Sequence, residues 1–130
     1  MTIDLWMLVD SALLCLLVPI FSLPRLLTIP GGMTWGFGNR DTSFPVPAWI
    51  ERTRRAHTNM VEALGPFACL VLVAHVSGKA NEASALGAQI FFFARVVHTG
   101  VYMAGVPVAR TLAFAAAIAG EMQILRQILS

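Results

Sequence analysis

An all-α membrane protein with four transmembrane helices is the fold class that this sequence predicts. Apolar residues make up 57% of the 130 residues and charged residues only 12%, whereas soluble domains have about 45–50% and about 25%. So little charge cannot cover a water-facing surface. Apolar segments of the length that crosses a bilayer, roughly 20 residues, occur four times along the chain.

The predicted helices form one domain, residues 1–130, and cover residues 5–27, 56–76, 83–104 and 108–129. Helices are expected because lipid offers no hydrogen-bond partners to an open backbone. Pro19 and Pro24 are expected to kink or end the first helix, and Pro107 to open the fourth. The fourth segment is rich in alanine, which lets neighbouring helices approach closely.

The links between the segments differ in character. Residues 28–55 form a long polar link whose glycines and prolines exclude a continuous helix, whereas residues 77–81 and 105–107 are short turns. The first basic residue, Arg25, follows the first apolar stretch, so that stretch is expected to be a retained helix and not a cleaved signal. Cys15 and Cys69 lie inside apolar runs and are interpreted as small hydrophobic residues.

Positive charge is concentrated in the first and third links. The arginines there are Arg25, Arg40, Arg52, Arg54, Arg55 and Arg110. The opposite side carries only Lys79 and Arg126. Because cytoplasmic loops carry the excess of Lys and Arg, the long first link is expected to be cytoplasmic and both termini to lie on the far side.

Polar residues at helical spacing fall on one face of two predicted helices. They are Arg55, Asn59 and Glu62 in the second helix and Arg95, His98 and Tyr102 in the third. The fourth helix begins with Arg110 and Thr111. Ionisable residues inside membrane segments are costly and usually functional. Arginines, an amide, a carboxylate and a phenol together suit a small anionic or zwitterionic ligand.

Other interpretations of the same residues arise from their chemistry. Glu62 and Arg95 could simply neutralise each other between two helices, with the remaining polar groups serving packing. The three histidines, His57, His75 and His98, have no metal-ligand spacing, so no metal is predicted. A net charge of +2 is too small to indicate a nucleic-acid partner. The lipid bilayer and a lipophilic small molecule are the expected partners.

Two stretches resemble the MAPEG family, the membrane-associated proteins in eicosanoid and glutathione metabolism. They are ERTRRAHTNMVEALGPF, residues 51–67, and ARVVHTGVYMAGVPVART, residues 94–111, which contain RAxxNxxE and RxxHxxxY. GNRD at residues 38–41 looks like the bacterial branch, which favours a bacterial inner membrane. The resemblance implies a homotrimer of four-helix subunits, with glutathione as cosubstrate bound between neighbouring subunits.

The resemblance also implies roles for single residues. Arg110 would stabilise the thiolate of glutathione, with the hydroxyl of Thr111 beside it. The tripeptide would be held by Arg55, Asn59, Glu62, Arg95, His98 and Tyr102, of which those on the third helix hold the ligand or brace the second helix. At two positions, Thr58 and Phe114, the residue type differs from the one found in the branch of the family that the second helix most resembles. The basic residue of the family's first helix has two candidate counterparts, Arg25 and Arg40.

The sequence therefore predicts a membrane-bound, glutathione-dependent transferase or peroxidase that acts on a lipophilic electrophile or hydroperoxide by thiolate attack. The alternative, from a different class, is a non-catalytic membrane protein whose polar cluster serves helix packing or a regulatory interaction. Retention on immobilised glutathione would separate the two.

The predicted topology can be checked with reporter fusions. A reporter placed within residues 30–50 and one placed after Lys79 should report opposite sides of the membrane, the first cytoplasmic, because of the arginine excess in the first link. Two fusions that report the same side would contradict the predicted number of crossings between them.

Overall fold

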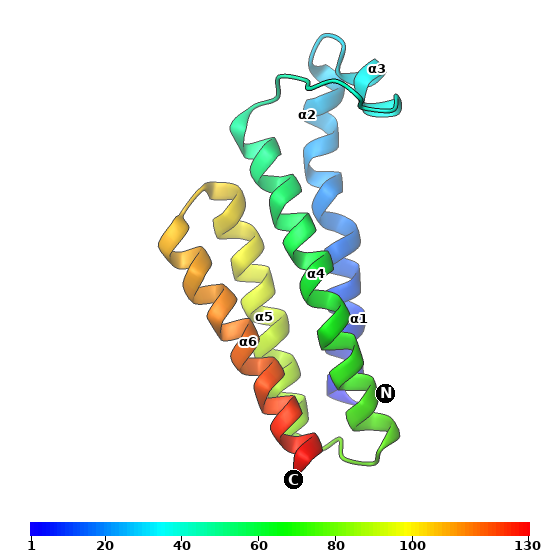
Figure 1. Cartoon of the computed structure of the whole chain (residues 1–130), viewed down its shortest axis with the longest axis vertical. Helices are drawn as coiled ribbons and strands as arrows, with labels where there is room; N and C mark the ends of the chain where they lie inside the picture. Colours follow the sequence, from blue (N-terminus) through cyan, green and yellow to red (C-terminus); the bar gives the residue numbers. More distant parts are fainter.

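A computed structural model describes all residues, 1–130, and contains only helices and the links between them (Figure 1). The elements are α1 (Ile3–Leu17), the 3₁₀ segment η1 (Val18–Ser22), α2 (Leu23–Thr28), α3 (Gly32–Phe37), α4 (Ala48–Val76), α5 (Glu82–Ala104) and α6 (Pro107–Leu129). The all-helical fold class predicted from the sequence is confirmed.

The first apolar helix is longer than predicted, and it changes from an α-helix to a 3₁₀ helix near its first proline. α1, η1 and α2 follow one another without a break, so that residues Ile3–Thr28 form one apolar rod. Pro19 lies in the first turn of η1 and Pro24 in the first turn of α2. Proline lacks a backbone N–H and crowds the preceding turn. The chain responds by tightening locally to a 3₁₀ helix rather than by ending.

The second long helix starts much earlier than predicted. α4 begins at Ala48 and not at residue 56, so the sequence AWIERTRR is helical. Pro47 occupies the cap position, and Glu51 lies in the first turn, where a carboxylate suits the helix dipole. Glu51 also pairs with Arg54 one turn later, at 2.7 Å. The first link is further shortened by α3, a six-residue helix that the glycine-rich sequence did not predict.

Clear signals in the sequence set the ends of α5. The Asn81 side chain accepts hydrogen bonds from the backbone N–H groups of Ala83 and Ser84, and the Ser84 hydroxyl accepts one from the Asn81 backbone N–H, which is a capping box. Gly105 ends the helix with a φ of 82°, a left-handed conformation that glycine adopts without strain. Pro107 then opens α6 in its first turn, as predicted.

The closest approach between helices is that of α5 and α6. A Cβ on Gly87 would lie 2.7 Å from the carbonyl oxygen of Gly120, and a Cβ on Gly120 would lie 2.6 Å from that of Gly87. The two backbones are therefore in direct contact. The core also contains a pair of stacked rings, Phe67 of α4 on Phe91 of α5, with ring centroids 3.8 Å apart.

Three helical rods are long and apolar enough to cross a membrane: Ile3–Thr28, Ala48–Val76 and Pro107–Leu129. Many of their large apolar side chains, such as Leu16, Leu72 and Leu112, are exposed, as expected for lipid-facing helices. α5 has the length of a span but carries Arg95, His98 and Thr99, all of them buried inside the bundle.

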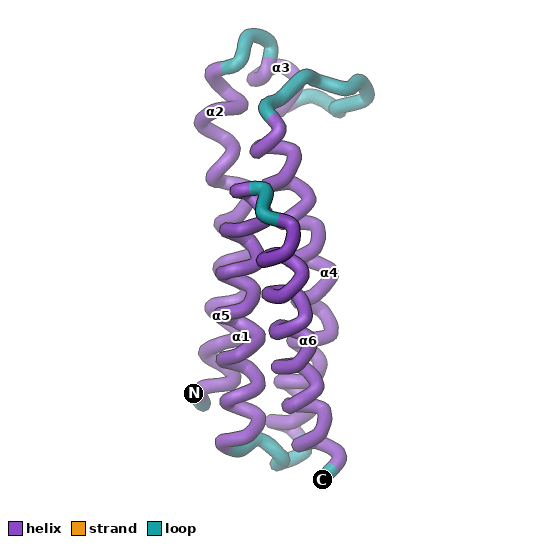
Figure 2. The backbone as a smooth tube through the Cα atoms, turned by 90° about the vertical axis from the view of Figure 1, so that its left-hand side faces the viewer, coloured by secondary structure: helices purple, strands orange, loops and turns teal.

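The helices run side by side, and both termini lie at one end of the bundle together with the α4–α5 link (Figures 1 and 2). The opposite end holds α2, α3, the start of α4 and the α5–α6 turn. Hence the first link and the α5–α6 turn, which carry most of the arginines, share one end of the molecule.

The contact between the α5 and α6 backbones can be tested by a matched pair of substitutions within α5. Gly87→Ala should lower the melting temperature, because the added methyl group collides with the Gly120 backbone, and overpacking costs about 1–3 kcal/mol. Gly100→Ala meets no atom within 4 Å and should be neutral or stabilising by up to about 1 kcal/mol. Equal effects of the two substitutions would contradict this packing.

Candidate functional site

A cavity of about 250 Å³ lies between α4, α5 and α6 near the α5–α6 turn. Its six lining residues are Asn59, His98, Tyr102, Arg110, Thr111 and Phe114. Helical spacing in the sequence singles out Asn59, His98 and Tyr102, and the position near the start of the fourth helix singles out Arg110 and Thr111. The structure brings them together because α5 ends where α6 begins, so that the last turns of one helix face the first turns of the other.

Aromatic side chains pack against one another and against Arg110 in the walls of this cavity. The Tyr102 ring stands edge-on to the His98 ring, at 5.5 Å between centroids, and Phe114 packs on His98 from α6 at 6.4 Å. The guanidinium carbon of Arg110 lies 4.6 Å from the centroid of the Tyr102 ring. A cation over an aromatic face is held in place while its N–H groups stay free for an anion.

Two polar atoms of the cavity walls are buried without a hydrogen-bond partner, Oδ1 of Asn59 and Nδ1 of His98. Buried polar atoms are rarely left unpaired, because each costs about 1–3 kcal/mol. The Thr111 hydroxyl, in contrast, already donates to the Pro107 carbonyl oxygen at 3.1 Å. The walls therefore offer an amide, an imidazole, a phenol and a guanidinium to a polar ligand.

A second hollow, of about 190 Å³, adjoins the first at the α5–α6 turn and shares Tyr102 and Arg110 with it. Arg52 and Arg55 of α4 add two more guanidinium groups there. The hollow therefore extends the polar cavity toward the arginine-rich end of the molecule.

Arg52 lines the second hollow, although in the sequence it served only as evidence for the membrane topology. Its Nε donates to the Met103 carbonyl oxygen at 2.9 Å, and the guanidinium packs beside Gly105. Arg52 precedes Arg55 by three residues and Asn59 by seven, which puts all three on one helical face. This spacing could have identified Arg52 as a site residue. Arg52 thereby ties α4 to the α5–α6 turn.

Arg55 and Glu62 lie on the same face of α4 as Asn59 but are exposed. Neither lies in an ion pair, since the one side-chain ion pair is Arg54–Glu51. Glu62 and Arg95 therefore do not form the ion pair that their spacing in the sequence allowed. Arg55 lines the adjoining hollow, whereas Glu62 lies about one turn from Asn59 along α4.

Arg95 does not line the cavity. Its side chain is fully buried, and its Nε contacts the sulfur of Met60 on α4 at 3.3 Å. Of the two roles that the family resemblance implied for this residue, holding the ligand or bracing the second helix, the contact with α4 corresponds to the second.

A third cavity, of about 330 Å³, lies on the other side of α4, against η1 and α2. Arg40, Arg54, His57 and Thr58 contribute its polar lining. Arg25, the other candidate for the family's first-helix basic residue, is exposed and donates to Thr28 at 3.4 Å instead.

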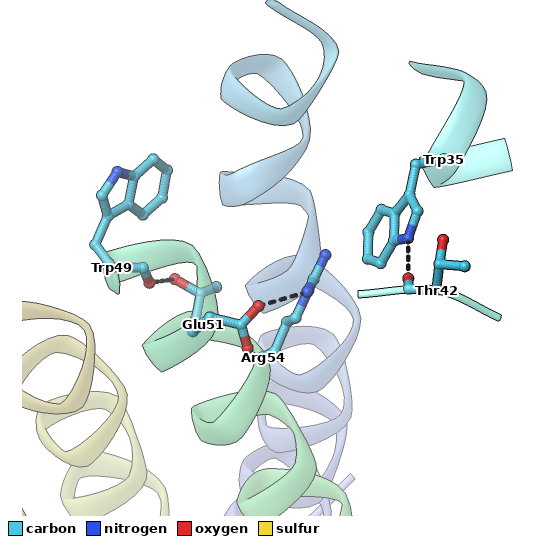
Figure 3. Close-up of polar contacts among 6 residues, drawn as sticks. Trp35, Thr42, Trp49, Glu51 and Arg54 are labelled. Carbon is cyan, nitrogen blue, oxygen red and sulfur yellow. Dashed lines mark hydrogen bonds and ion pairs between the residues drawn. The ribbon is translucent and has the colours of Figure 1, made fainter. Parts of the chain in front are cut away.

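The first link is anchored over this third cavity by Trp35. The guanidinium carbons of Arg40 and Arg54 lie 5.3 and 4.7 Å from the centroid of its ring. Its indole N–H donates to the Thr42 carbonyl oxygen at 2.7 Å, as Figure 3 shows together with the Arg54–Glu51 pair. Arg40 also donates to the Gly36 carbonyl oxygen. The link is thus a folded cap and not an open loop.

Comparison with known proteins gives one decisive match. The family model described as the MAPEG family matches residues 5–126. The chain belongs to the MAPEG family. The resemblance seen in the sequence is thereby confirmed, and together with the apolar helices it makes the chain an integral membrane protein. MAPEG proteins include glutathione transferases and peroxidases as well as non-catalytic members. A search of curated proteins found no significant match.

Proposed function

We propose that this MAPEG protein is a membrane-bound, glutathione-dependent transferase or peroxidase whose acceptor is a lipophilic electrophile or hydroperoxide. One observation carries the proposal: Arg110 lies over Tyr102 in a polar cavity that also holds unpaired atoms of Asn59 and His98. Glutathione carries carboxylates, amides and a thiol, which match guanidinium, amide and imidazole groups.

Arg110 is the proposed catalytic residue because it can hold the sulfur as an anion. A free thiol has a pKa near 8.5, so only a few per cent is thiolate at pH 7. A guanidinium beside the sulfur favours the anion by charge and by hydrogen bonding. Lowering the thiol pKa by about two corresponds to about 2.7 kcal/mol and makes most of the bound thiol nucleophilic. The thiolate then forms a C–S bond with the electrophile and displaces its leaving group. With a hydroperoxide, it attacks the terminal oxygen, the O–O bond breaks and the alcohol leaves. A second glutathione reduces the resulting sulfenic acid, which gives the disulfide and water.

Thr111 is a weaker candidate for the same role. Its hydroxyl would have to turn away from the Pro107 carbonyl oxygen before it could donate to the sulfur. The cost is modest because water or the ligand can replace that bond. Arg110 therefore carries the mechanism, with Thr111 as a secondary donor.

The size of the cavity supports a site shared between subunits. Pockets for small molecules measure about 300–1,000 Å³ and enclose most of the ligand, whereas the Arg110 cavity measures about 250 Å³. Arg55 and Glu62, on the same face of α4 as the cavity residue Asn59, are exposed. We propose a homotrimer in which the neighbouring subunit closes this side.

In a closed ring each interface joins two different faces. The cavity lined by Arg40 and His57 lies on the other side of α4 and is the proposed face that meets the Arg110 cavity of the neighbour. Arg40, not Arg25, is then the counterpart of the family's first-helix basic residue.

The same proposal includes four membrane crossings. α5 is the fourth, because it is as long as its neighbours and turns its polar residues toward the bundle. The arginine-rich end, with the α5–α6 turn, faces the cytoplasm, which we take to be that of a bacterial cell with the protein in its inner membrane. A lipophilic acceptor can then reach the sulfur from the bilayer, between helices, while glutathione enters from the water.

The proposed role of Arg110 predicts a separation of binding from turnover. Arg110→Ala should keep glutathione-induced thermal stabilisation within a modest factor, since other residues hold the tripeptide. Its turnover of a generic electrophile should fall more than tenfold at pH 7 and recover in part toward pH 8.5, where the free thiol ionises unaided. The measurements are a melting curve with and without glutathione and a pH profile of turnover.

Arg126→Ala, at the opposite end of α6 and exposed, is the matched control and should behave as wild type in both measurements. A wild-type pH profile for Arg110→Ala would remove Arg110 as the catalytic residue. Absence of any glutathione-induced stabilisation in the wild-type protein would favour the non-catalytic alternative.

A further inference from the structure

The interior of the bundle holds a group of polar side chains that the proposed site does not use. Arg95 and Ser11 are 0% exposed, and Thr99 and Glu121 are 6% exposed. Each has a buried nitrogen or oxygen without a hydrogen-bond partner: both terminal nitrogens of Arg95, Oε1 of Glu121, and the hydroxyl oxygens of Ser11 and Thr99. They belong to α1, α5 and α6, of which α5 packs against both α1 and α6.

The register of α5 and α6 brings Arg95 and Glu121 toward each other. Gly87 faces Gly120 where the two antiparallel helices touch. The Cα of Glu121 therefore lies near the level of Gly87, and the Cα of Arg95 lies about 12 Å further along α5 toward the α5–α6 turn. Helical side chains lean toward the N-terminus of their own helix. The Arg95 side chain therefore leans down α5, and the Glu121 side chain leans up α6 to meet it.

Ser11 reaches the same depth from α1. Asp4 lies beside Ala80, Glu82 and Ala85 at the start of α5, and α1 and α5 run in the same direction. Seven residues later, about 10 Å along the axis, Ser11 stands below the level of Arg95, on the side toward which the guanidinium leans. Three helices thus carry buried polar groups at a similar depth in the bundle.

Arg95 has no adequate partner among the protein groups at that point. Its one contact is Nε to the sulfur of Met60 at 3.3 Å, and a thioether is a weak acceptor. The charges of Arg95 and Glu121 attract each other, but the two residues form no ion pair. A buried guanidinium left this way is strongly unfavourable, above all inside a membrane.

We propose that Arg95, Glu121 and Ser11 form a buried water-binding site, in which Glu121 is the counter-ion of Arg95 and water joins the two. The guanidinium offers only donors, the carboxylate only acceptors, and the serine hydroxyl offers both. Water matches all three and needs two to four such partners. An anion would be repelled by Glu121 and a cation by Arg95, so a small neutral molecule is the fitting ligand.

In this site the negative charge of Glu121 balances the positive charge of Arg95, so the interior of the bundle carries no net charge from this pair. It ties α1 to the α5–α6 hairpin through hydrogen bonds, in a region where the other contacts are apolar. It also keeps the Arg95 guanidinium away from the glutathione cavity, one turn above.

The first test detects the water directly, by X-ray radiolytic labelling of the full-length protein in nanodiscs. Hydroxyl radicals formed from bound water oxidise the nearest reactive side chain, and Met60 is 0% exposed yet touches Arg95. Met60 should be oxidised well above background in the wild type. Labelling should fall at least fivefold in Arg95→Leu/Glu121→Leu, which removes both charged groups. Background labelling of wild-type Met60 would overturn the proposal.

The second test measures coupling between the two charges by a double-mutant cycle. Glu121→Leu alone should lower the melting temperature by roughly 10 °C or more, because it leaves a buried charge without a counter-ion. Arg95→Met/Glu121→Leu should return most of that loss, since apolar replacement of a whole buried pair is often neutral.

Glu62→Leu, which removes an exposed acid of α4, is the control for the cycle and should show no coupling to Arg95→Met. A double variant as unstable as the sum of its single variants would overturn the assignment of Glu121. Coupling of Arg95 to Glu62 instead would overturn it too.

Discussion

The backbones of Gly87 and Gly120 touch, and this contact sets the register that places the polar side chains of α5 and α6. A side chain on either residue would fall within 2.7 Å of the other's carbonyl oxygen, so the two helices can neither rotate nor slide without losing the contact. The hairpin closes at Gly105, whose positive φ lets the chain turn directly into Pro107. Fixed at both places, α5 brings His98 and Tyr102 opposite Phe114 and Arg110. The polar cavity is a consequence of that alignment.

The same alignment separates the polar residues of α5 into two groups. His98 and Tyr102 face the cavity near the turn, while Arg95 faces the interior below it. One group remains open toward a ligand, and the other has to be satisfied within the bundle. This division explains how a membrane protein tolerates so many polar side chains on one helix: those near the water can serve chemistry, and the deep ones need an internal counter-ion.

The sequence predicted the polar faces but not their neighbours. Helical periodicity singled out Asn59, His98 and Tyr102, and the start of the fourth helix singled out Arg110 and Thr111. All five line one cavity. It could not show that Arg95 points inward to Met60, because a period of 3.6 residues fixes a face and not what that face meets. The sequence allowed Glu62 to neutralise Arg95 as one alternative, whereas the register of α5 and α6 leads us to propose Glu121 as the counter-ion. The early start of α4 at Ala48 was missed because proline and glycine were interpreted as helix breakers, although Pro47 acts here as a cap.

The central claim is that the Arg110 cavity becomes a glutathione site only when a neighbouring subunit covers it. Native mass spectrometry of the protein released from lipid nanodiscs, with and without glutathione, tests this most directly. We expect a trimer that gains the mass of glutathione, and monomers, released at higher collision energy, that do not retain it. Glutathione bound to isolated monomers, or a protein that stays monomeric or dimeric in lipid, would contradict the claim.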